Sequence, residues 1–107
     1  MKDDAFYLLH IMDSISKIKD HISGVDYEGF LSSRLIQSAV IRELEIIGEA
    51  AKNVSVETKS KHPDIPWRLM SGMRDKLIHD YFGVDLDAVW ETVKRDLPTL
   101  KNKLADL

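Results

Sequence analysis

Residues Met73–Asp85 combine, within thirteen positions, side chains that can bind a phosphate, transfer a proton and offer a phenolic oxygen. Arg74 is a permanently charged donor that can grip a phosphate through two parallel N–H groups. Histidine side chains titrate near neutral pH, so His79 can act as a base or as an acid. Cleaving RNA without a metal ion needs a base for the ribose 2′-OH, an acid for the leaving oxygen and a cation for the developing negative charge. Arg74 and His79 are therefore candidate catalytic residues, with Tyr81 close by.

The spacing of these residues does not gather them on one face of a regular helix. Arg74 and Tyr81 are seven positions apart and share a face, whereas His79 lies about 140° round the helix from Arg74. Either the helix loosens near His79, or a second copy of this surface completes the pocket across a two-fold axis. A purely structural alternative stays open, in which Arg74 pairs with an acid such as Asp75 or Glu49 and His79 caps a helix end.

Apolar residues recur every three or four positions along most of the chain, which is the period of an amphipathic helix. No run of alternating apolar and polar residues predicts a strand. The pattern predicts an all-α, up-and-down bundle of four long helices and one short helix, forming a single domain over residues 1–107. The expected long helices are Asp3–His21, Tyr27–Lys52, Trp67–Tyr81 and Leu86–Leu107, and the short helix starts at Ser55.

Two residues interrupt this helical pattern in an informative way. Gly48 lies inside a predicted helix, where glycine costs about 1 kcal/mol relative to alanine, so we expect another helix to approach closely there. Glu49 follows it and is the acid of that helix best placed to reach inward. Pro98 lies within the last predicted helix and predicts a kink or a new helical start.

Composition limits what the protein can do. The chain has 107 residues, no cysteine and a formal net charge of −3, so disulfides and thiolate metal sites are excluded and no general attraction to nucleic acid is expected. No stretch approaches the roughly 18 consecutive apolar residues of a membrane-spanning helix. The N-terminus also lacks the features of a signal peptide. These observations predict a cytoplasmic protein that does not associate with membranes.

Sequence motifs for metals and cofactors are absent. The four histidines, at positions 10, 21, 62 and 79, include no pair with the spacing that places two ligands on one helix face. There is no glycine-rich phosphate loop of the GxGxxG or GxxxxGK[ST] type. We therefore expect neither a metal site nor a cofactor.

The segment Arg74–Tyr81 (RDKLIHDY) resembles the RX4HXY motif of HepT-like proteins in the HEPN superfamily, the toxin halves of HepT/MntA pairs. The likeness extends over nearly the whole chain. It includes Ile46–Ala51 (IIGEAA), the approach Ile65–Trp67 with Gly72-Met73-Arg74, the exit Tyr81–Asp85 and the Val89-Trp90 and Leu97-Pro98 segments.

This resemblance implies a homodimeric helical bundle in which the motifs of both subunits line a shared cleft. It implies a metal-independent ribonuclease, the toxin of a type II toxin–antitoxin system, with RNA such as tRNA or mRNA as substrate and no role for DNA. Arg74 would bind phosphate and His79 would be the acid/base, while Asp75 fits the polar residue common after the motif arginine and Glu49 would be a supporting acid. The cognate antitoxin, an MntA-type nucleotidyltransferase, would inactivate the toxin by transferring AMP to Tyr81.

Two other functions are compatible with the same residues. The chain could be a non-catalytic helical subunit that presents nucleotide or substrate to a nucleotidyltransferase, with Arg74 holding the nucleotide and His79 structural. It could also be a dimeric scaffold in which both residues serve only the interface. RNA cleavage, nucleotide binding and dimer formation by variants of these two residues discriminate among the three.

Overall fold

The computed structural model describes residues 3–80 and 83–107, and this part of the chain is helical with no strand. The all-α class predicted from the sequence is therefore confirmed. The elements in chain order are α1 Asp4–His21, α2 Tyr27–Ser32, α3 Arg34–Asn53, α4 Val56–Lys61, α5 Trp67–His79, α6 Leu86–Glu91, the π-helical turn η1 Thr92–Asp96, and α7 Leu97–Ala105.

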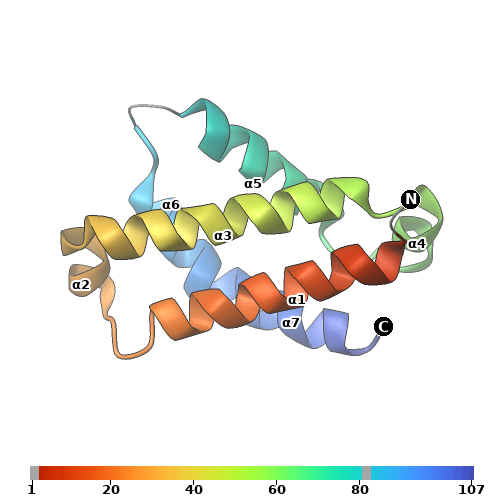
Figure 1. The fold of residues 1–107 in the computed structure, drawn as a ribbon, viewed down its shortest axis with the longest axis horizontal. Coiled ribbons are helices and arrows are strands. Elements are labelled where there is room, and N and C mark those ends of the chain that lie inside the picture. Colours follow the sequence, from red (N-terminus) through yellow and green to blue (C-terminus); the bar gives the residue numbers. More distant parts are fainter. Residues whose placement is uncertain (1–2, 81–82) are drawn as a thin grey trace.

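The longest helix, α3, runs through the middle of the molecule, with α1 along one side and α5 along the other (Figure 1). The segment formed by α6, η1 and α7 lies behind α3 and α1 in this view. Successive long segments reverse direction, so their apolar faces meet in one core. That core is made of aliphatic and aromatic side chains from nearly every helix, including Ile11, Ile18, Phe30, Val40, Ala51 and Val89. None of the described helices is long and apolar enough to cross a membrane.

The predicted helix Tyr27–Lys52 is wrong as a single element, because the chain breaks at Ser33 into α2 and α3. Ser33 is extended (φ −119°, ψ 104°), and its hydroxyl accepts a hydrogen bond from the Ile36 N–H at 3.2 Å, which starts α3. Gln37 closes the other side of the break, since its Nε2 donates to the carbonyl oxygens of Phe30 and Leu31 at the end of α2. Local side-chain hydrogen bonds therefore compensate for the interrupted helix.

The last predicted helix is also composite, and Pro98 explains why. Proline has no N–H and its ring clashes with the carbonyl four residues earlier. The chain widens before it into a π-helical turn, in which the Leu97 N–H donates to Thr92 O five residues back, and α7 then begins at Leu97. The expected new helical start at Pro98 is thus confirmed. Because this segment has three parts and α2 is separate from α3, the predicted count of four long helices is not reproduced.

The short helix α4 follows α3 and is hydrogen-bonded to the start of α1. It begins as expected after Ser55, whose Oγ accepts from the Thr58 N–H at 3.2 Å. Asp4, at the start of α1, accepts hydrogen bonds from Ser55 N at 2.8 Å, from Ser55 Oγ at 2.6 Å and from the Thr58 hydroxyl. These hydrogen bonds also lower the pKa of Asp4, and they fasten the first turn of α1 to the end of α3.

Helices α3 and α5 approach closely at Gly48, as the sequence predicted. A Cβ atom at this position would lie 2.1 Å from Arg74 Cβ and 2.7 Å from the carbonyl oxygen of Met70. Neither atom belongs to the flexible end of a side chain, so the backbone of α5 would have to move. Glycine at position 48 is therefore what lets Arg74 lie directly against α3.

We predict that Gly48→Ala destabilises the protein although alanine is the better helix former. Overpacking of a tight contact costs about 1–3 kcal/mol, which exceeds the gain of up to about 1 kcal/mol in helix propensity. Gly72→Ala is the matched control, because Gly72 is also helical but has no atom within 4 Å of the added Cβ. Urea unfolding should show a lower free energy of unfolding for Gly48→Ala and an unchanged or higher one for Gly72→Ala. Equal effects of the two substitutions would contradict the close contact.

Candidate functional site

Arg74 lies on the face of α5 that contacts α3, and its guanidinium is held by two carboxylates. Its Nε is 3.1 Å from Glu49 Oε2 on α3, and its Nη1 donates to Asp75 Oδ1 at 2.9 Å. The Arg74 side chain is 27% exposed, so the group is partly shielded but still reachable from solvent. Both acids that the sequence named as alternative partners are therefore engaged, and Nη2 donates to no residue in the described part of the chain.

Two further polar residues at the end of α3 extend this group. Lys52 Nζ donates to Asp75 Oδ1 at 3.1 Å, so one carboxylate oxygen serves both Lys52 and Arg74. Asn53 Nδ2 donates to Glu49 O at 2.9 Å and lies 3.4 Å from Glu49 Oε1, which orients the acid. The sequence analysis did not identify Lys52 or Asn53. Their spacing from Glu49, three and four residues on the same helix, is the signal that could have found them.

The electrostatics of this group follow from the sharing of Asp75. The hydrogen bond from Arg74, and then that from Lys52, lower the pKa of the Asp75 carboxyl below its ordinary value. A carboxylate whose pKa is lowered by folding contributes stability at pH values above its unfolded pKa, and this contribution is lost as the pH falls through the folded pKa. Asp75 therefore stays ionised, and its ion pairs stay intact, throughout the neutral range.

His79 is the last residue of α5, exposed to solvent and apart from the Arg74 group. Its side chain has no hydrogen-bond or ion-pair partner within residues 3–80 and 83–107. The structural role proposed for it, capping the helix end, is not what is observed, because the N–H that closes the helix belongs to Asp80 and donates to Lys76 O. The helix is regular up to His79, so Arg74 and His79 of one chain point in different directions, as the spacing indicated.

Tyr81 lies outside the described residues. Helix α5 was expected to continue to about Tyr81, but it ends at His79, and Asp80 is no longer helical (φ −85°, ψ 68°). The prediction that Arg74 and Tyr81 share a helix face required α5 to continue to Tyr81, and α5 ends before it. Tyr81 is identified as the motif tyrosine from the sequence.

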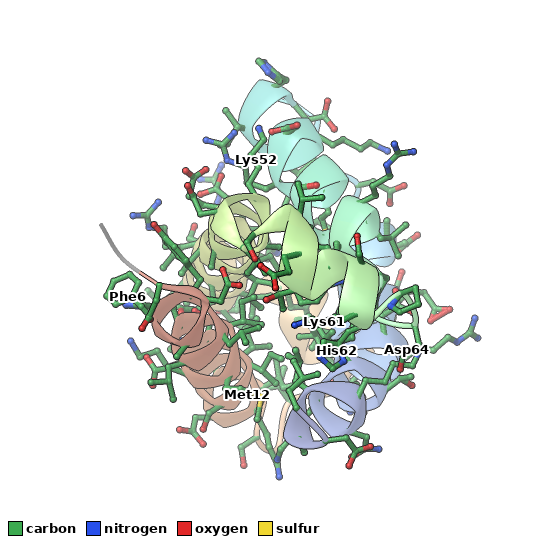
Figure 2. All side chains as sticks on the ribbon, turned by 90° about the vertical axis from the view of Figure 1, so that its right-hand side faces the viewer. Phe6, Met12, Lys52, Lys61, His62 and Asp64 are labelled. Carbon is green, nitrogen blue, oxygen red and sulfur yellow. The ribbon has the colours of Figure 1, made fainter. Side chains whose placement is uncertain are left out.

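A cleft of about 300 Å³ lies beside Arg74, between α1, α3 and α5. Helix α3 contributes Glu49 and Asn53 to it, and α1 contributes an aromatic edge that the sequence analysis did not assign to a site. Figure 2, which looks along the bundle from the end that carries α4, shows Phe6 pointing outward from α1 and Lys52 where α3 and α5 meet. The residues lining the cleft are Phe6, Tyr7, His10, Arg42, Glu45, Ile46, Glu49, Ala50, Asn53, Arg74 and Ile78.

The signal that could have located the α1 residues is their position off the apolar stripe. Ile11, Ile15 and Ile18 point into the core, whereas Phe6 and His10, four residues apart, form a second face of the same helix.

The described residues contain no group of three or more His, Asp or Glu side chains arranged to hold a metal ion.

The fold and the site define an all-helical domain in which an arginine lies against a glycine of the neighbouring helix. Comparison with known proteins identifies its family. The model of the family described as "Ribonuclease HepT-like" matches residues 11–107, and the chain belongs to this family. No solved structure matches the chain significantly.

Individual relatives agree with this assignment. The chain is 52% identical over 101 residues to "Probable ribonuclease HepT" of Thermococcus cleftensis, covering 94% of this chain and 92% of that protein. It is 39% identical over 107 residues to a protein named "Putative RNase TTE0752" of Caldanaerobacter subterraneus, covering 100% and 96%. A Methanocaldococcus jannaschii protein named "Gamma-glutamylcyclotransferase and putative RNase MJ0434" is 47% identical over 103 residues, but these make up only 46% of that longer protein.

We predict that the pKa of Asp75 responds to its two cationic partners unequally. In wild-type protein it should lie below the ordinary value of 3.8, and Arg74→Ala should raise it more than Lys52→Ala, because the hydrogen bond from Arg74 has the larger effect. Carbon-13 NMR titration of the Asp75 carboxyl measures this. Lys17→Ala is the control, since Lys17 pairs with Asp13 on α1 and should leave Asp75 unchanged. An ordinary Asp75 pKa in wild-type protein would show that the ion pairs do not form in solution.

Proposed function

We propose that this protein is a metal-independent endoribonuclease and the toxin of a type II toxin–antitoxin pair, acting on cytoplasmic RNA such as tRNA or mRNA. The observation that carries this proposal is the state of Arg74, whose guanidinium is fixed through Nε and Nη1 at the wall of a cleft while Nη2 has no partner in the described chain. Membership of the HepT-like ribonuclease family, with relatives named as RNases, supports the choice of RNA as substrate.

The proposed chemistry is an internal attack by the ribose 2′-oxygen on the adjacent phosphorus. A base removes the 2′-OH proton, the 2′-oxygen bonds to phosphorus, and the bond to the 5′-oxygen of the next nucleotide breaks as that oxygen gains a proton. Arg74 stabilises the additional negative charge on the phosphate. His79 is the residue for proton transfer, because it is exposed and its imidazole is not committed to another group in the described chain.

A single subunit does not provide the complete site. Arg74 and His79 lie on different faces of α5, and one histidine cannot be base and acid in the same step. A homodimer with a two-fold axis near the end of α5 would place two copies of each residue round one substrate. The partly exposed Ile78, which lines the cleft beside these residues, supplies apolar surface for such an interface.

We further propose that a nucleotidyltransferase of the MntA type is the antitoxin and transfers AMP to Tyr81. The tyrosine follows two residues after His79 in sequence. A phosphodiester-linked AMP there would add negative charge and bulk near the phosphate-binding groups, and it would repel RNA by the same electrostatics as a phosphorylation.

We predict that Arg74→Ala and His79→Ala each lower the rate of RNA cleavage at least about 100-fold, the usual size of an acid–base or charge-stabilising contribution. Lys76→Ala is the control, since Lys76 lies on the same helix and is exposed outside the cleft. Cleavage of a labelled RNA in EDTA measures both the rates and the independence from metal ions. Cleavage that persists in both variants, or that stops on chelation in wild-type protein, would refute the proposed mechanism.

The proposed switch has its own test. After co-expression with a nucleotidyltransferase encoded beside it, the intact mass should rise in steps of one AMP, and RNA cleavage should fall with it. Tyr81→Phe should abolish the mass increase and remain active in the presence of the nucleotidyltransferase. Modification of the Tyr81→Phe protein to the same extent would place the acceptor elsewhere.

The second candidate function is a non-catalytic subunit that binds nucleotide for a nucleotidyltransferase. The pairing of Arg74 with Glu49 and Asp75 favours it, because an arginine held by two carboxylates can be purely structural. Purified protein that cleaves no RNA, but binds both a nucleotide and the nucleotidyltransferase, would support this function over the first.

A further inference from the structure

We infer that the cleft between α1, α3 and α5 binds one nucleobase of single-stranded RNA, with Phe6 and His10 as its stacking surface, beside the phosphate held by Arg74. This inference rests on the proposed function, because it assigns a base-binding subsite to the same substrate. It gives α1, which carries none of the motif residues, a role in selecting where the RNA binds.

The aromatic side chains of α1 form a compact group at the rim of this cleft. The Phe6 and His10 ring centroids are 4.5 Å apart with their planes tilted by 60°, and Tyr7 meets Phe6 edge-on at 5.2 Å. His10 is exposed, whereas Tyr7 is partly buried against the core. An exposed imidazole in contact with a phenyl ring is the kind of aromatic surface on which unpaired bases stack.

Hydrogen bonds anchor the first turn of α1, where this aromatic surface begins. The Asp3 side chain accepts a hydrogen bond from the Phe6 N–H at 3.0 Å, which caps α1 at this turn. Asp4 bonds to Ser55 and Thr58 beyond the end of α3, as described above. Because α1 is anchored here to the segment that follows Glu49 and Asn53, a ligand that touches His10 can also reach Arg74 across one cleft.

The polar residues of the cleft provide groups that can contact the phosphate and the base of a nucleotide. Arg42 is paired with Glu45 at 3.7 Å, but its side chain is 71% exposed, and such a surface pair contributes little stability. Arg42 can therefore turn to a neighbouring phosphate at small cost. Glu45 and Asn53 present acceptor and donor groups that can pair with the edge of a base. The volume, about 300 Å³, lies at the lower end of the range for small-ligand sites and fits one base with its sugar.

The test measures binding of an RNA that cannot be cleaved, a fluorescein-labelled 2′-O-methyl hexamer, by anisotropy. We expect His10→Leu and Phe6→Leu each to raise its Kd about tenfold, as for loss of one base–aromatic stack. We expect His10→Phe to retain near wild-type affinity, because phenylalanine stacks and leucine does not. Leu9→Ala is the matched control, since Leu9 is adjacent on α1 and 70% exposed but does not line the cleft, and it should leave the Kd unchanged.

The outcomes separate this subsite from the proposed ribonuclease activity. If wild-type protein cleaves no RNA but the hexamer still binds in a His10- and Phe6-dependent manner, the ribonuclease function fails and the subsite stands. If RNA is cleaved but His10→Leu and Phe6→Leu bind the hexamer as wild type does, the subsite is wrong. Equal affinities of His10→Leu and His10→Phe would also overturn it. The subsite would also be wrong if these variants lost binding of free 5′-AMP but kept wild-type affinity for the hexamer. That result would assign the cleft to a mononucleotide instead of RNA.

Discussion

The contact between Gly48 and the backbone of α5 is the constraint on which the candidate site depends. With any larger residue at position 48, Arg74 Cβ could not lie where it does, and α5 would stand farther from α3. The reach of the Arg74 guanidinium to Glu49, and of Lys52 to Asp75, is set by that separation. The absence of a Cβ atom at Gly48 thus sets the geometry of four charged side chains, those of Glu49, Lys52, Arg74 and Asp75. The ion pairs could not do this by themselves, because each pair is partly exposed.

The parts of the structure that the sequence predicted well are those governed by local rules. The apolar stripe of α1, the Ser55 cap and the interruption at Pro98 follow from helix periodicity, capping and the missing proline N–H, and each is present. The break at Ser33 was missed because the flanking apolar residues keep a helical period across it. Serine is a preferred N-cap residue, and Ser33 caps α3 while Gln37 bonds back to the end of α2. The capping signal of Ser33 was therefore present in the sequence, but it was weaker than the continuous apolar pattern.

The residues of the candidate site also fall into those that the sequence predicted and those that it did not. Pairing of Arg74 with Asp75 and Glu49 could be foreseen because all three lie in or beside predicted contact faces. The position of Phe6 and His10 off the apolar stripe can be read from the sequence, but their place beside Arg74 cannot, because Arg74 lies more than sixty residues later. The folded bundle creates that relation by placing α1 and α5 on either side of α3 (Figure 1). The proposed roles of His79 and Tyr81 continue to rest on residue type and family resemblance.

The cleft arginines are paired with carboxylates, and this pairing affects how the affinity for a polyanion depends on salt concentration. A phosphate that displaced a carboxylate from Arg42 or Arg74 would exchange with a glutamate or aspartate already in place, instead of filling an empty positive site. Counterion release makes the affinity of most nucleic-acid-binding proteins fall steeply with ionic strength, and freeing an internal carboxylate would partly balance it. In a chain of net charge −3, long-range attraction also contributes little. A polyanion would therefore be selected here by shape and by contacts at short range, at an affinity that changes little between dilute buffer and the ionic strength of a cell.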